Sequence, residues 1–182
     1  MKQTILIRDV QLVQGGISPR CDMLIQDGVI AKLGKDLNES AHFVIDGSRL
    51  TALPGLFDMH VHLRDPGFTD KEDIYTGCRA AAAGGVTSLL CMPNTKPAVD
   101  TPETVRYILD KAKTADAPVY VAAAITQWLK GEALGDLEAL HAAVIISFTD
   151  DGRPVTQNAS PVHALCAAPN LTMPRTAHST TF

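Results

Sequence analysis

From residue 55 onward, the sequence alternates between apolar segments typical of strands and segments typical of helices. The strand-like segments are apolar over most of their length, so both faces of each strand are expected to be covered. Alternation of this kind predicts a parallel sheet with helices packed outside it. The expected strands are residues 56–64, 86–94, 118–126 and 144–152, and the expected helices are residues 74–85, 101–116 and 135–143.

Polar residues gather at the carboxyl ends of the predicted strands, where the active sites of (β/α)8 barrels are built. The residues of this kind are His60, His62, Arg64, Asn94, Asp150 and Asp151. A complete barrel takes about 250 residues, which is more than the 182 residues of this chain. We therefore predict that residues 55–158 form the N-terminal half of a (β/α)8, or TIM-type, barrel, with about its first four to five βα units.

The two ends of the chain have different patterns. Residues 1–54 contain short segments rich in Ile, Val and Leu with turn signals in or between them, which predicts a small β-sandwich-like domain ahead of the barrel. Residues 159–182 lose the alternation, contain three prolines and end in a Ser/Thr-rich stretch. We interpret residues 159–182 as an atypical tail that is truncated or altered by a shift in reading frame.

Charge and composition exclude some classes of function. The formal net charge is −4, which argues against nonspecific binding of nucleic acid, because that binding favours a basic surface. The sequence has no run of about 18 apolar residues, so no membrane span is expected. The cysteines are Cys21, Cys78, Cys91 and Cys166, which are far apart and form no CxxC motif. We interpret them as buried, reduced thiols of a cytoplasmic protein.

The segment GLFDMHVHLRDPG, residues 55–67, carries the most distinctive chemistry. In a strand, alternate residues point to opposite faces. One face would carry Asp58, His60, His62 and Arg64, and the other would carry Phe57, Met59, Val61 and Leu63. Two imidazoles on one face can reach the same metal ion, and zinc favours nitrogen ligands. A lone HxH pair is equally consistent with histidines that serve only the fold.

Three further residues could act at the same edge of the sheet. In FTDDG, residues 148–152, Asp150 is consistent with a turn, whereas the Asp151 carboxylate could bridge two metal ions that hold a hydroxide between them. Asn94 could donate a hydrogen bond to a polar substrate, although Pro-Asn is also a turn signal. The Arg64 guanidinium suits bidentate binding of a substrate carboxylate, and a surface salt bridge is the alternative.

The order of these motifs resembles the amidohydrolase superfamily and, within it, the long bacterial type of dihydroorotase. The segments that carry the resemblance are PGLFDMHVHLRDPG, GGVTSLLCMPNTKPAVDT and FTDDG. The resemblance covers residues 1 to about 158 and implies an N-terminal fragment of a metal-dependent hydrolase. The implied activity is the reversible cyclisation of N-carbamoyl-L-aspartate to L-dihydroorotate by a zinc-bound hydroxide, a step of pyrimidine biosynthesis.

The resemblance also implies roles for individual residues. It implies two zinc ions, with His60 and His62 binding the more buried one and Asp151 bridging both. The second zinc would be bound by His178, although the acidic pair that usually follows this histidine in the family is absent here. The implied substrate contacts are His62, Arg64 and Asn94. The acid/base aspartate of the family is absent from this chain, so we expect the chain by itself to be inactive.

Other functions stay open at this point. An allantoinase or dihydropyrimidinase usually has a carboxylated lysine as the bridging ligand, and Arg64 and Asp151 argue against both. A non-catalytic relative that assembles with aspartate transcarbamoylase would lose metal ligands, whereas this chain retains His60 and His62. A half-barrel without function is the third alternative. We expect a small-molecule substrate, and either a homodimer or a complex with aspartate transcarbamoylase.

Overall fold

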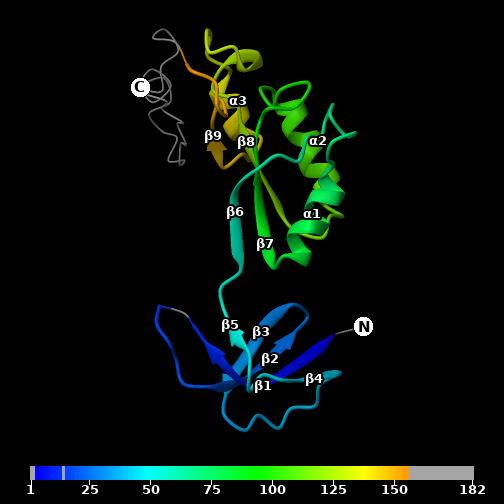
Figure 1. Cartoon of the computed structure of the whole chain (residues 1–182), viewed down its shortest axis with the longest axis vertical. Helices are drawn as coiled ribbons and strands as arrows, with labels where there is room; N and C mark the ends of the chain where they lie inside the picture. The colour runs from blue at the N-terminus through cyan, green and yellow to red at the C-terminus, as the bar shows by residue number, and fades with distance from the viewer. Residues whose placement is uncertain (1–2, 14, 156–182) are drawn as a thin grey trace. The chain divides into compact units, whose positions relative to one another are not determined.

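The computed structural model describes residues 3–13 and 15–155. The predicted tail at residues 159–182, with His178, lies outside the described residues. Contacts between residues divide the chain into two units, Met1–Pro54 and Gly55–Phe182 (Figure 1). Each unit has its own sheet and its own hydrophobic core.

The first unit is a five-stranded sheet. Its strands are β1 (Thr4–Leu12), β2 (Cys21–Gln26), β3 (Val29–Gly34), β4 (Phe43–Asp46) and β5 (Thr51–Ala52). The order is β3-β2-β1-β4, with β5 also paired to β1. The pairs of β2 with β1 and β3 are antiparallel, whereas β4 and β5 run parallel to β1. The core of this unit consists of Leu6, Leu24 and Leu37, with Ala41 packed against it.

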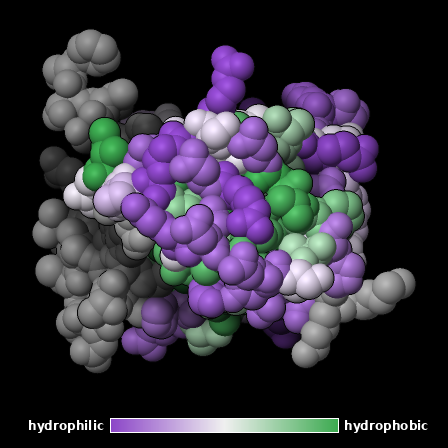
Figure 2. Space-filling model, turned by 90° about the horizontal axis from the view of Figure 1, so that it is seen from below, coloured by the Kyte–Doolittle hydropathy of each residue, from purple (hydrophilic) through white to green (hydrophobic). Residues whose placement is uncertain are grey.

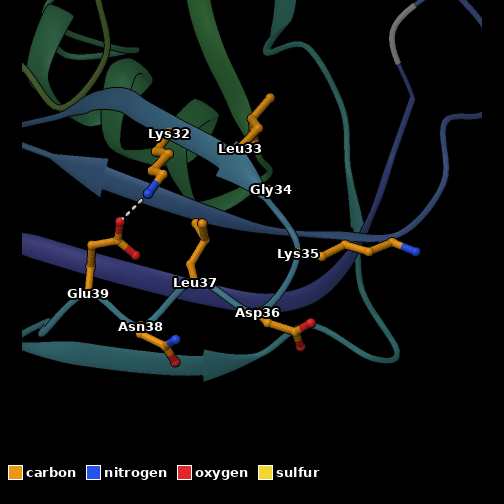
Figure 3. Close-up of a pocket in the computed structure, with 8 residues that line it drawn as sticks. All are labelled: Lys32, Leu33, Gly34, Lys35, Asp36, Leu37, Asn38 and Glu39. Atoms are coloured by element: carbon orange, nitrogen blue, oxygen red, sulfur yellow. Dashed lines mark hydrogen bonds and ion pairs between the residues drawn. The ribbon is translucent and has the colours of Figure 1, made fainter.

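The surface of the first unit is only partly polar. Several apolar side chains of β3 and β4 are exposed, including those of Val29, Ile30, Phe43 and Val44. Figure 2 shows apolar patches between hydrophilic residues on the face seen there. Residues 32–39, which begin in β3 and continue past its end, line a pocket in which Lys32 and Glu39 form an ion pair (Figure 3).

The second unit contains the predicted parallel sheet. Its elements are β6 (Leu56–Val61), α1 (Ile74–Ala83), β7 (Val86–Cys91), α2 (Pro102–Ala112), β8 (Val119–Ala123), the 3-10 turn η1 (Gln127–Leu129), α3 (Leu137–Ala142) and β9 (Ser147–Phe148). The sheet order is β6-β7-β8-β9, and every neighbouring pair is parallel. Helices α1 and α2 lie together on one side of this sheet (Figure 1). The prediction of a partial (β/α)8 barrel after a small β-sheet layer is therefore confirmed.

Two helices of the second unit begin at residues that cap helix N-termini. Thr101 is the N-cap of α2, where its side chain accepts a hydrogen bond from the Thr104 N–H, and Pro102 is the first helical residue. Helix α1 begins after Asp73, whose carboxylate and the Thr76 hydroxyl form a reciprocal capping box. This helix ends at Gly84-Gly85, and Gly85 has a left-handed φ of 81° that glycine adopts without strain.

The main core of the second unit lies between the sheet and its helices. It includes Leu89 and Cys91 of β7, Val119 and Val121 of β8, and Ile74, Val105, Ile108 and Leu140 of the helices. Because the helix-facing side of each strand is buried here, the other side and the strand ends are left for chemistry. In the part of the chain that is described, no helix has the length and apolar character needed to cross a membrane.

The strands are shorter than predicted, and the expected alternation in β6 holds only in part. Val61 and Leu63 pack on the core, whereas Phe57 and Met59 are exposed. The reason is that the pairing of β6 with β7 shifts register twice along the strand. The centroid of the Phe57 ring instead lies 5.5 Å from the centroid of the Tyr120 ring of β8. Phe57 and Met59 therefore do not pack on the core with Val61 and Leu63, with which the predicted alternation had placed them on one face.

Candidate metal centre

The carboxyl ends of β6 and β9 bring three potential metal ligands together. His60 lies in β6 and His62 directly follows it, whereas Asp151 follows β9. His60 Nε2 is 3.1 Å from Asp151 Oδ1, and His62 Nδ1 is 3.6 Å from Asp151 Oδ2. One ligand atom from each residue lies within 4.8 Å of the other two. Residues far apart in the sequence thus form one cluster at the edge of the sheet.

The donor atoms of this cluster fit a metal ion. Zinc in proteins binds nitrogen and oxygen at about 2.0–2.2 Å in a tetrahedral arrangement, which places neighbouring ligand atoms about 3.4 Å apart. The 3.1 Å separation between His60 Nε2 and Asp151 Oδ1 is close to that spacing. The Asp151 side chain is 8% exposed, and those of His60 and His62 are 41% and 30% exposed. The cluster is therefore open on the histidine side, which leaves room for a small ligand.

Asp58 does not join the cluster, although the predicted alternation placed it on the same face as the histidines. Its carboxylate accepts a hydrogen bond from the backbone N–H of His60, within the same strand. This local bond forms where the register of β6 with β7 shifts between Asp58 and Val61. The shift explains why Asp58 is exposed while His60 reaches Asp151.

Asn94 lies between His62 and Asp151. Its amide nitrogen donates a hydrogen bond to Asp151 Oδ2, and its amide oxygen is 2.9 Å from His62 Nδ1. Because a carboxylate only accepts, the amide nitrogen must face Asp151, and the amide oxygen then faces His62. In a neutral His62 ring, Nδ1 therefore carries the proton that faces Asn94, and Nε2 keeps the lone pair that could bind a metal ion. Asn94 thus sets the tautomer of His62, a role that the sequence did not predict.

Arg64 belongs to a loop that is held tightly against its neighbour. Arg64 has a left-handed φ of 60°, which is strained for a residue with a side chain, and its carbonyl accepts a hydrogen bond from Phe68. A Cβ at Gly67 would lie 2.0 Å from the Lys96 carbonyl oxygen, so only glycine fits there. Within the described residues, no hydrogen bond or ion pair of the Arg64 guanidinium is found.

A buried ion pair anchors the same loop, and nothing in the sequence pattern indicated it. The Asp65 side chain has no exposed surface, and its carboxylate lies 2.6 Å from Lys111 Nζ on helix α2. The Tyr107 hydroxyl of α2 donates a second hydrogen bond to it. The hydrogen bond to Asp65 raises the pKa of Lys111. The loop that carries Arg64 is thus fixed to α2.

Two cysteines in the described part of the barrel unit belong to its core. Cys78 and Cys91 are buried free thiols within the core between sheet and helices. Burial raises the pKa of Cys91 to about 12 and also raises the pKa of Cys78. Thiols bind metal as thiolates, so neither residue is suited to that role.

Comparisons with known proteins relate this chain to one family. Residues 49–181 match the family described as Dihydro-orotase-like. A dihydroorotase from Syntrophotalea carbinolica is 47% identical over 165 residues, which are 90% of this chain and 39% of the relative. A dihydroorotase from Geobacter sulfurreducens is 50% identical over 145 residues, which are 79% of this chain and 34% of the relative. The chain therefore spans well under half the length of these relatives.

Solved structures show the same architecture. A dihydropyrimidinase from Brevibacillus agri is 25% identical with a TM-score of 0.76, over 98% of this chain and 40% of that chain. A D-hydantoinase is 25% identical with a TM-score of 0.77, over 97% of this chain and 40% of that chain. Both likenesses support the fold assigned to the two units.

Proposed function

The chain belongs to the dihydro-orotase-like family, and from this premise we propose that it supplies the first part of a zinc-dependent dihydroorotase site. The proposed reaction is the reversible cyclisation of N-carbamoyl-L-aspartate to L-dihydroorotate. The observation that carries the proposal is the cluster of His60, His62 and Asp151 at the carboxyl edge of the sheet. Both relatives at 47% and 50% identity are dihydroorotases, whereas the dihydropyrimidinase structure is only 25% identical. These identities favour dihydroorotase over the cyclic amidohydrolases that we considered as alternatives.

In the proposed site, each residue has a distinct task. His60, His62 and Asp151 would hold the metal, and Asn94 would keep the His62 proton on Nδ1. A bound divalent metal supplies positive charge that polarises a carbonyl oxygen and acidifies a water molecule. The Arg64 guanidinium would bind the substrate carboxylate through two parallel hydrogen bonds, which fixes the substrate in one orientation. Asn94 would also contact the substrate in this proposal.

A zinc titration of the purified 182-residue chain tests the metal site. We expect the wild-type chain to bind zinc through these three residues, and His60→Ala to lose at least about tenfold in affinity, since one of three protein ligands is removed. His141→Ala is the matched control, because His141 is exposed on α3 and is no part of the cluster. Equal zinc affinity for wild type and His60→Ala would contradict the proposal.

Three further predictions come from the sequence. They are a second zinc bound through His178, a homodimer or a complex with aspartate transcarbamoylase, and a cytoplasmic location. We also expect the 182-residue chain by itself to lack activity, because no residue of its sequence matches the acid/base aspartate of the family. An assay of the zinc-loaded chain with L-dihydroorotate checks this, and substantial turnover would show that the expectation is wrong.

A further inference from the structure

Asp150, next to the candidate metal ligand Asp151, accepts hydrogen bonds from two backbone N–H groups and one hydroxyl. Asp150 is only 4% exposed. Asp150 Oδ1 accepts hydrogen bonds from the backbone N–H groups of Ile125 and Thr126, at 2.8 and 3.0 Å. Its Oδ2 accepts a hydrogen bond from the Thr126 hydroxyl. A turn aspartate at Asp-Gly would be exposed, so the interpretation of Asp150 as a turn residue alone does not account for these contacts.

Asp150 joins the segment after β9 to the segment after β8. The Thr126 hydroxyl that donates to Asp150 also accepts a hydrogen bond from the Gly131 N–H, at 2.9 Å. A Cβ at Gly131 would lie 2.4 Å from the Pro154 carbonyl oxygen, so the two segments approach as closely as a glycine allows. The segments are therefore fastened together on both sides of Asp151.

Asp151 needs this fastening because its own backbone is strained. It has a φ of 38°, in the left-handed region that residues with a side chain rarely adopt. Its N–H donates to the Thr149 hydroxyl oxygen at 3.0 Å, and its carboxylate lies 3.1 Å from His60 Nε2. A strained conformation persists only when the surrounding structure holds it. The hydrogen bonds of the neighbouring Asp150 would hold the backbone of Asp151 in this conformation.

We propose that Asp150 is a positioning residue that holds Asp151 in the orientation required for metal binding. The proposal rests on the proposed function, in that it assumes a metal ion at His60, His62 and Asp151. It predicts that both oxygens of Asp150 are needed, since one accepts from two backbone N–H groups and the other from a hydroxyl. An asparagine would retain one acceptor oxygen and place an N–H donor pair against Thr126.

The test compares zinc affinity in Asp150→Asn with that of the wild-type chain. We expect affinity to fall about 10- to 100-fold, as is typical when a group that orients a metal ligand is lost. Leu140→Ala is the stability control, because Leu140 is fully buried in the core and is absent from the cluster. A merely structural role for Asp150 predicts equal losses of zinc affinity in both variants, and that result would overturn the proposal. Unchanged affinity in Asp150→Asn would overturn it as well.

A crystal structure of Asp150→Asn keeps the proposal testable if the wild-type chain binds no zinc, a result that contradicts the proposed function alone. We expect the Asp151 carboxylate to move away from His60 Nε2, to which it lies at 3.1 Å in the wild type. An unchanged separation would show that Asp150 does not position Asp151. Thr126→Val provides a second variant, since it removes the hydroxyl that donates to Asp150 Oδ2 and leaves the carboxylate in place.

Discussion

Two buried aspartates each neighbour a candidate site residue: Asp65 follows Arg64, and Asp150 precedes Asp151. The partners of their carboxylates differ in kind. Asp65 lies in the turn after β6 and is paired with a cation, Lys111 of α2. Asp150 follows β9 and accepts hydrogen bonds from neutral donors of the segment after β8. The comparison shows two means of fixing a loop at the edge of a barrel. One depends on a charge from another element, and the other depends on backbone geometry.

The largest effect on stability is expected from the charged anchor, which is the buried ion pair of Asp65 and Lys111. Among the described residues, Lys111→Met leaves the buried Asp65 carboxylate with the Tyr107 hydroxyl as its remaining side-chain partner. Removing one partner of a buried ion pair costs about 3–5 kcal/mol. Urea denaturation should show a fall of that size in the free energy of unfolding. Lys113→Met is the matched control, since the Lys113–Asp110 pair is exposed and such pairs contribute about 0–1 kcal/mol. Equal losses in the two variants would show that Asp65 does not depend on its cation.

A smaller effect on stability is expected from the neutral anchor, which is Asp150 with its hydrogen bonds to Ile125 and Thr126. Asp150→Ala leaves the backbone N–H groups of Ile125 and Thr126 buried without an acceptor. Since each unsatisfied buried group costs about 1–3 kcal/mol, and a water molecule in the space of the removed carboxylate would satisfy part of this loss, we expect a loss of about 2–3 kcal/mol in the same measurement. A loss as large as that of Lys111→Met would remove the distinction between the two anchors.

The Tyr107 hydroxyl separates charge from hydrogen bonding in the first anchor. Tyr107→Phe removes one hydrogen bond to Asp65 but retains Lys111. A hydrogen bond to a charged group contributes about 1.5–3 kcal/mol, and we expect a loss near the lower bound because the ion pair persists. Denaturation of this variant beside Lys111→Met checks the order of the two losses. A reversed order would mean that the hydroxyl, not the cation, stabilises Asp65.

The sequence predicted the part of this structure that follows from repetition and from strand ends. Alternating segments indicated the parallel sheet, and the rule that active sites form at the carboxyl ends of strands placed His60, His62 and Asp151 at one edge. The structure brings these three residues together. Asn94 was also predicted at this edge, but its bond to His62 depends on the rotamers of both side chains, which no spacing indicates.

Contacts between distant elements could not be predicted in the same way. Asp65 has the sequence context of a loop residue, and Lys111 has that of a helix surface. Their pairing requires the exact angle at which α2 packs on the sheet. Asp150 was assigned to a turn because Asp-Gly is a turn signal, and its acceptors face a segment that ends another strand. The sequence does not show that Asp150 is buried, so its hydrogen bonds to the segment after β8 could not be predicted before the fold was known.

The smallest expected effect is the change of stability with pH, which should differ between the Asp65–Lys111 ion pair and the hydrogen bonds of Asp150. The hydrogen bond to Asp65 raises the pKa of Lys111 above its ordinary value of 10.5. A cation with a raised pKa in the folded state contributes its full stabilisation below the ordinary pKa and loses it as pH rises through the folded value. The difference in unfolding free energy between wild type and Lys111→Met should therefore be constant from about pH 7 to 10 and shrink above pH 10.5. The difference between wild type and Asp150→Ala should not shrink over that upper range, because the donors to Asp150 are backbone amides and a hydroxyl. If both differences shrank together in alkaline denaturation experiments, the two loops would share one charged support, and Asp150 would depend on a cation after all.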